Sequence, residues 1–318
     1  MKHGGDNMYF PYLRGRQYEL IAIRELAELG LISNLVKPVV EPIKPTTTLL
    51  KTINSFIENE LELAVIHNPR VGNFSDEYRI LSNEKLKENF QNAFKNPFII
   101  VSHIINENSY HELDSLFKDG HTREELLLIN NDGDNIDNYL KIFDNAKPRF
   151  NLIPDATSIR RRVRENKVLL ADKFDKLVRN SDYLDKEDSY FSEDHLFYKD
   201  EGYIGFSDYS IVGSEYSESG FAPYAVAIHI VYKDNNNCFR VKHFVSDSNE
   251  DYRDPAGKFS EALDKLMQWQ SDMKINTYAM SEFRKHYEKG TYPGLGPIKK
   301  LAIMHHIELV SNFLDEER

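Results

Sequence analysis

The sequence predicts an α/β protein built as a (β/α)8, TIM-like barrel, and three observations indicate this class. Eight short apolar runs recur at roughly 20–36 residue intervals, the period of repeated βα units. Most runs are continuously apolar rather than alternating, which is typical of parallel strands buried on both faces. Stretches with helical spacing lie between them. An open doubly wound sheet is the alternative, but no Gly-x-Gly-x-x-Gly follows the first run, which disfavours a dinucleotide-binding sheet.

The runs define the expected strands, and apolar stripes define the expected helices. The strands are expected at residues 38–43, 61–67, 97–105, 125–129, 149–154, 167–172, 203–207 and 224–232. The helices between them are expected at 48–58, 84–95, 110–118 and 136–143. Asn83 precedes the second helix, and Thr157 with Ser158 precedes a further, Arg-rich one, as helix start signals do.

Both ends of the chain add to the plain barrel. Residues 1–32 form a lead-in, extended at 9–14, and an amphipathic helix at 17–29 that covers the barrel bottom, with Gly30 as its C-cap. The last strand extends into a hairpin, because 224–232 and 239–245 flank an Asp- and Asn-rich turn at 233–237. Within 247–318 we expect three helices packed on the barrel, at 257–270, 277–289 and 297–314. The acidic, aromatic segment 182–194 is the largest expected surface insertion. We expect one domain over 1–318.

Composition and charge narrow the class of protein. No apolar stretch approaches the roughly 18 residues that a membrane span needs, and no apolar core follows the N-terminal Lys, so neither a membrane protein nor a secretory signal is expected. The single cysteine, Cys238, excludes an intramolecular disulfide and favours a reducing, cytoplasmic setting. A net charge of −11 disfavours nucleic-acid binding. The exception is a local basic face formed by Arg160, Arg161, Arg162 and Arg164, which we interpret as an exposed helical face bonded to carboxylates.

Several segments resemble one protein family. Residues 9–20 read Tyr-Phe-Pro-Tyr-Leu-Arg-Gly-Arg-Gln-Tyr-Glu-Leu, and residues 39–44 read Val-Val-Glu-Pro-Ile-Lys. Segments 205–209, 225–229, 243–247 and 254–259 extend the likeness over most of the chain. The chain resembles the bacterial and phage "beta family" proteins. The resemblance implies a barrel-like fold and a bacterial setting, often associated with phages or mobile elements. It implies no mechanism.

Candidate functional residues were sought at the carboxyl ends of the expected strands, where barrel sites gather. The candidate catalytic residues are Glu41, His67, Asp155, Asp172 and Asp208, and the candidate ligand-binding residues are Lys44, Arg70, Lys173 and His229. Carboxylates and a histidine suit general acid–base work or a hard cation, whereas Arg and Lys suit an anionic group. The basic residues are close enough in sequence that no metal is required, and no cofactor is identified.

Each candidate also has a structural reading. Glu41 can instead pair with Lys44, Arg14 or Arg16 and tie down the N-terminal segment. His67 can bond to a backbone carbonyl, and the aspartates can cap helices or form salt bridges.

Three functions therefore stay open. No Gly-x-Ser-x-Gly, His-Glu-x-x-His, P-loop or Cys-x-x-Cys is present. The first hypothesis is a binding or sensing component of a phage-defence or mobile-element system, with a small-molecule or anionic ligand and a protein partner encoded nearby. The second is a barrel hydrolase or lyase that uses the strand-end carboxylates and His67, with or without a divalent cation. The third is a scaffold that contacts a partner chain through its aromatic insertion.

Overall fold

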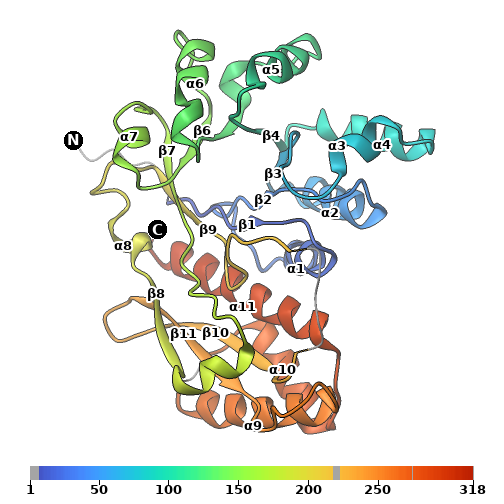
Figure 1. Cartoon of the computed structure of the whole chain (residues 1–318), viewed down its shortest axis with the longest axis vertical. Helices are drawn as coiled ribbons and strands as arrows, with labels where there is room; N and C mark the ends of the chain where they lie inside the picture. The colour runs from blue at the N-terminus through green and yellow to red at the C-terminus, as the bar shows by residue number, and fades with distance from the viewer. Residues whose placement is uncertain (1–6, 218–222, 274, 318) are drawn as a thin grey trace. The chain divides into compact units, whose positions relative to one another are not determined.

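The computed structural model describes residues 7–217, 223–273 and 275–317 (Figure 1). Its contacts divide the chain into two compact units. The first consists of Met1–Ala171, Asp194–Asp208 and Glu317–Arg318, and the second of Asp172–Glu193 and Tyr209–Glu316. The expectation of one domain over 1–318 stays a prediction.

The first unit is a (β/α)8 barrel, which confirms the predicted fold class. Its parallel sheet runs in chain order through β1 (Tyr12–Leu13), β2 (Val39–Val40), β3 (Leu63–Ile66), β4 (Ile99–Ile104), β5 (Leu127–Ile129), β6 (Phe150–Ile153), β7 (Lys167–Ala171) and β9 (Gly205–Asp208). A parallel bridge between Tyr9 and Phe206 joins the last strand to the segment before the first. There the Phe10 N–H donates to the Phe206 carbonyl at 2.9 Å, so the sheet closes on itself.

The barrel helices lie outside the strands (Figure 1). They are α1 (Gln17–Glu28), α2 (Thr47–Glu58), α3 (Phe74–Arg79), α4 (Glu84–Phe94), α5 (Ser109–Lys118), α6 (Ile136–Ile142), α7 (Thr157–Arg160) and α8 (Asp194–Phe197), with 3-10 turns η1 (Arg123–Glu125) and η2 (Gly133–Asn135). The predicted start of α4 is confirmed, because the Asn83 side chain accepts from the Leu86 N–H. Gly30 follows α1 with a left-handed φ of 65°, as a C-terminal glycine should.

Two strand assignments made from the sequence are wrong. The segment at 9–14 is the first barrel strand rather than a lead-in, and 224–232 does not belong to the barrel. The first was missed because β1 has only two residues and follows Pro11, so no apolar run marks it. As a consequence α1 is the first barrel helix, not a cover for the barrel bottom. It packs on α2, where the Thr52 hydroxyl donates to the Leu20 carbonyl at 3.2 Å.

The second unit is built on a three-stranded antiparallel sheet in the order β10–β11–β8. The strands are β8 (Asp188–Ser192), β10 (Ala227–Lys233) and β11 (Phe239–Val245). The predicted hairpin between β10 and β11 is confirmed, and Asn237 takes the left-handed conformation in its turn. The expected insertion at 182–194 supplies β8 and part of η3 (Asn180–Asp185), so it is a structural part of this sheet.

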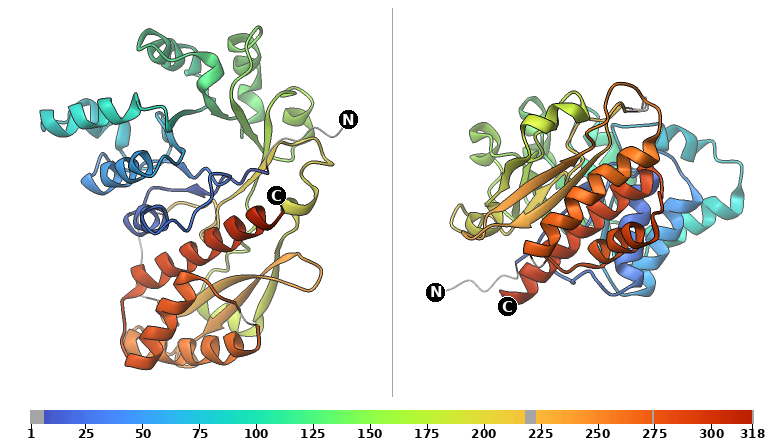
Figure 2. Two further views of the ribbon diagram at one scale, coloured as in Figure 1. Left: turned by 180° about the vertical axis from the view of Figure 1, so that it is seen from behind. Right: turned by 90° about the horizontal axis from the view of Figure 1, so that it is seen from below.

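The three helices predicted near the C-terminus are present, but they pack within the second unit, whereas they were expected to pack on the barrel. They are α9 (Pro255–Met273), α10 (Tyr278–Lys289) and α11 (Leu295–Glu316). α9 and α11 pack against the β10–β11 hairpin (Figure 2), where the Trp269 ring contacts Tyr232 and Phe244 and the Phe313 ring contacts Phe239. Within the described ranges no helix is long and apolar enough to cross a membrane.

Candidate functional site

Glu41 joins the carboxyl ends of the first three barrel strands. Its buried carboxylate accepts from the Tyr12 hydroxyl at 2.7 Å and from the Arg70 backbone N–H at 2.7 Å, and it pairs with the Arg14 guanidinium. Both carboxylate oxygens therefore have protein donors. This geometry agrees with the structural reading of Glu41, which tied the N-terminal segment to the barrel.

His67 is directed toward the helix layer. Its ring lies 4.7 Å from the Phe94 ring on α4 and 6.5 Å from the ring of His121, measured between centroids. Burial and the neighbouring His121 lower the pKa of His67 to about 4, so the ring is neutral at neutral pH. Its buried Nε2 has no hydrogen-bond partner among the described residues. A group that is neutral and packed against a phenyl ring is poorly placed to move protons at the barrel mouth.

The two other barrel carboxylates have separate partners. Asp155 is exposed and forms a 2.6 Å ion pair with Arg160. Asp208 is buried and accepts from the Tyr9 hydroxyl at 2.9 Å. Burial and the Asp208 charge raise the pKa of Tyr9 well above its usual value, so the phenol stays protonated as the donor.

The candidates of the second unit have local partners too. Asp172 accepts from the Ser214 N–H at 2.8 Å and lines a hollow of ≈ 420 Å³ with Lys173. His229 lies in the sheet, with its Nδ1 atom 2.8 Å from Nδ1 of His243. Mainly through burial, the pKa of His229 falls to about 3. The predicted site thus draws on residues of both units, and its convergence on one cavity stays a prediction.

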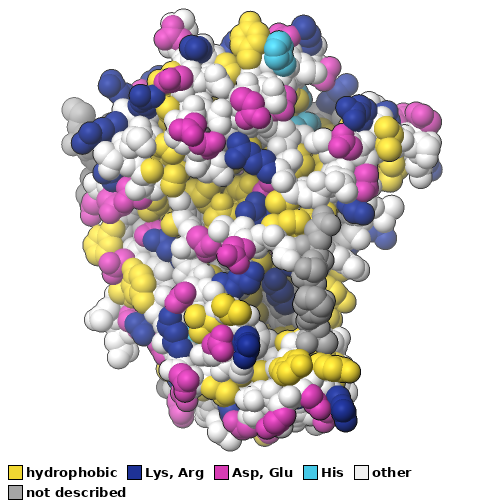
Figure 3. Space-filling view, in the orientation of Figure 1, with side chains coloured by type: hydrophobic (Ala, Val, Ile, Leu, Met, Phe, Trp, Pro, Cys, Tyr) yellow, Lys and Arg dark blue, Asp and Glu magenta, His cyan; other side chains and the backbone are white. Residues whose placement is uncertain are grey.

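The basic candidates differ in how far they are engaged. Lys44 is exposed and lies 3.4 Å from Glu77. Among the run of arginines, Arg160 pairs with Asp155, and Arg162 pairs with Asp137 at 2.6 Å. The face seen in Figure 3 carries interspersed basic and acidic side chains. These contacts agree with the interpretation of the arginines as a face bonded to carboxylates.

The residues that the barrel does bring together lie after β3, β4 and β5. They line a hollow of ≈ 390 Å³ formed by Asn68, Pro69, Arg70, Ser75, Asn106, Glu107, Asn108, Glu112 and Asp132. Arg70 is the one residue of the predicted set in this lining. The hollow lies at the carboxyl edge of the barrel, the edge where the βα loops of such barrels build their sites.

Glu112 is the centre of the polar network in this hollow. Its Oε2 atom accepts from the amides of Asn68 at 2.8 Å and Asn106 at 3.0 Å, and Nε2 of His103 lies 3.5 Å away. Burial lowers the pKa of His103 to about 3, so the neutral ring, 2.9 Å from the Ser109 hydroxyl, brings no positive charge to Glu112. Oε1 of Glu112 hydrogen bonds to no described residue.

Arg70 follows β3 and contacts the segment that follows β4, next to the Asn106 amide that Glu112 binds. One guanidinium nitrogen donates to the Ile105 carbonyl at 3.0 Å, next to Asn106, whose amide is bonded to Glu112. The other guanidinium N–H groups of Arg70 form no hydrogen bond with a described residue. The hollow therefore offers a fixed cationic donor and a fixed anionic acceptor around one short peptide segment. This arrangement suits a ligand with an anionic group and a hydroxyl or ammonium group.

The network was missed from the sequence for a clear reason. Glu112 lies on α5, well beyond the end of β4, so a search of strand ends could not find it. One sequence signal for this network was available: an asparagine follows each of two consecutive strands, Asn68 after β3 and Asn106 after β4.

Throughout the part of the chain that the structure describes, no three His, Cys, Asp or Glu side chains are arranged to hold a metal ion. Comparison of the sequence with protein-family models and with curated proteins returned no match.

Proposed function

We propose that the barrel binds a small polar molecule in the hollow at the ends of β3, β4 and β5. One observation carries the proposal: Arg70 and Glu112 flank the Ile105–Asn106 segment, and each keeps hydrogen-bonding atoms that no described residue occupies. An arginine fork matches carboxylate or phosphate oxygens. A carboxylate oxygen accepts from a hydroxyl or an ammonium group. The volume of ≈ 390 Å³ lies within the range of small-molecule sites.

We infer a binding or sensing role rather than hydrolysis or lyase chemistry. Both oxygens of Glu41 accept from protein donors, and the neutral His67 ring packs against Phe94. These contacts do not favour the acid–base pair that the alternative enzyme reading needs. The further proposal that this role belongs to a bacterial phage-defence or mobile-element system, with a partner encoded nearby, rests on the sequence resemblance alone.

The binding proposal is tested by the small molecules that copurify with the protein. Wild type and Arg70→Ala are purified from the same cells without dialysis, and the molecules released on denaturation are quantified by mass spectrometry. Arg70→Ala keeps the backbone bond to Glu41, so the fold is retained. Arg79→Ala is the matched control, because Arg79 is exposed on α3 and pairs with Asp76.

Wild type and Arg79→Ala should release the same anionic molecule in equal amounts. Arg70→Ala should release at least about tenfold less, the effect of losing a hydrogen bond to a charged group. Glu112→Gln should also release less, because an amide cannot balance an ammonium group. Equal release from Arg70→Ala, or no small molecule from wild type, would contradict the proposal.

A further inference from the structure

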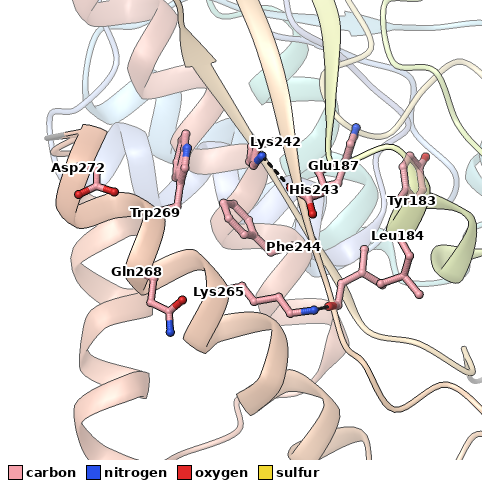
Figure 4. Close-up of a pocket in the computed structure, with 11 residues that line it drawn as sticks. Tyr183, Leu184, Glu187, Lys242, His243, Phe244, Lys265, Gln268, Trp269 and Asp272 are labelled. Carbon is pink, nitrogen blue, oxygen red and sulfur yellow. Dashed lines mark hydrogen bonds and ion pairs between the residues drawn. The ribbon is translucent and has the colours of Figure 1, made fainter.

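A further hollow, of ≈ 410 Å³, lies wholly within the second unit (Figure 4). On β11, Lys242 and Phe244 are two residues apart and so share one face of the sheet. On α9, Lys265, Gln268, Trp269 and Asp272 have the i, i+3, i+4, i+7 spacing that places them on one side of a helix. Tyr183 and Leu184 complete the lining from η3. Strand and helix therefore direct aromatic and basic side chains into one space.

The aromatic part of this hollow is held in place. The Trp269 ring lies 5.3 Å from the Tyr232 ring and 5.3 Å from the Phe244 ring, between centroids, so its neighbours fix its orientation. Figure 4 shows Trp269 and Phe244 on one side and Tyr183 with Leu184 on the other, with Lys265 between the two groups. A fixed indole beside open space is a surface on which a planar ring can stack.

The two lysines of the hollow are less exposed than the carboxylates that pair with them. Lys242 has 22% of its side chain exposed, whereas its partner Glu187, 3.2 Å away, has 74% exposed. Lys265 is 38% exposed, and Asp247, which it contacts at 2.7 Å, is 74% exposed. Asp272 is exposed as well. The two lysine side chains are therefore less exposed than the carboxylates that pair with them, which favours an anion in the hollow over a cation.

We propose that this hollow binds a nucleoside monophosphate or a similar planar aromatic anion, with the ring against Trp269 and the phosphate at Lys242 and Lys265. Ammonium groups bind phosphate as point charges. Lys242 pairs with Glu187, and Lys265 donates to the Val245 carbonyl and pairs with Asp247, so each ammonium group keeps at least one further N–H donor. The Gln268 amide, at the exposed rim, has donors and an acceptor for the edge of a base. This site is separate from the barrel hollow and does not depend on a ligand there.

The chain itself supplies the reporter for a test, because Trp269 is its single tryptophan. Adenosine monophosphate, guanosine monophosphate and uridine monophosphate are titrated to about 1 mM, a range that detects weak binding. Tryptophan emission is followed in wild type and in Lys242→Gln, Lys265→Gln and Lys285→Gln. Lys285, paired with Glu282 on α10, lies outside the hollow and is the matched control. Circular dichroism verifies that each variant is folded.

At least one nucleotide should change the emission of wild type and Lys285→Gln saturably. Lys242→Gln and Lys265→Gln should each weaken binding about tenfold, as should removal of the phosphate in the parent nucleoside. Inorganic phosphate alone should leave the emission unchanged. The proposal is overturned by the lack of a saturable change with all three nucleotides, by nucleoside binding as tight as nucleotide binding, or by wild-type affinity in Lys242→Gln.

Discussion

Five histidines whose pKa values fall to about 4 or below should make the protein sensitive to mild acid. Burial is the largest cause in each case, and it lowers the pKa of His103 and His229 to about 3 and that of His67, His243 and His305 to about 4. In the unfolded chain each titrates near 6.5. Between these values the unfolded state binds more protons, so the free energy of unfolding must fall as the pH drops below about 6.5.

The size of the effect follows from linkage. Between pH 7.5 and 5.5 each histidine that stays neutral in the fold and protonates on unfolding lowers the free energy of unfolding by about 1 kcal/mol. The first unit holds two such histidines and the second holds three, so each unit loses a few kcal/mol, a substantial part of the 5–15 kcal/mol that stabilises ordinary domains. We therefore expect a marked loss of stability in mild acid.

Urea denaturation followed by circular dichroism at pH 7.5, 6.5 and 5.5 measures this slope. His103→Gln should reduce the loss of free energy between pH 7.5 and 5.5 by about 1 kcal/mol, because one titrating group is removed. His111→Gln removes an exposed histidine from the neighbouring α5 and should leave the slope unchanged. A wild-type stability that is flat over this range, or the same slope in His103→Gln as in wild type, would refute the reasoning.

Three substitutions at the barrel test the remaining packing claims by chemical denaturation. Glu41→Gln should lower the free energy of unfolding by about 3 kcal/mol, because the largely buried Arg14 guanidinium loses its ion pair with the Glu41 carboxylate, and the added change Arg14→Met should restore part of it; a loss under about 0.5 kcal/mol would contradict a stabilising role for the pair. Gly15→Ala should cost at least about 1 kcal/mol, since a Cβ there meets the Glu41 carbonyl oxygen at 2.8 Å with φ at +63°, and an unchanged stability would contradict this contact. Asp155→Asn should change stability by less than about 1 kcal/mol, because its pair with Arg160 is exposed; a larger loss would show a role that the contacts do not indicate.

Much of the barrel could be predicted because its strands are buried on both faces. All four residues of β3 and all six of β4 are buried, and such runs stand out from polar surroundings. β1 could not be recognised in this way, since two residues carry no pattern and the closing pair, Tyr9 and Phe206, is far apart in the chain. The run at 224–232 misled because β10, which is equally apolar, pairs only within an antiparallel hairpin of the second unit.

The candidate site could be predicted only in part. The rule that function gathers after barrel strands selected Arg70, which lines the hollow. It could not tell whether a side chain at a strand end points toward the barrel mouth or toward the helices. The His67 ring contacts Phe94 of α4, and the His103 ring contacts Ser109 of α5. That choice depends on strand register, which a single sequence does not reveal. Glu112 reaches the hollow from a helix, so no strand pattern predicts it.

The central claim is that the hollow between Arg70 and Glu112 is a ligand site, and its most direct measurement is a crystal structure of the protein that still holds its copurified molecule. The account predicts difference density in this hollow, with an anionic group at hydrogen-bonding distance, about 2.7–3.2 Å, from the Arg70 guanidinium and a hydroxyl or ammonium group at Oε1 of Glu112. Density for the molecule at another place in the protein, with only water between Arg70 and Glu112, would contradict it.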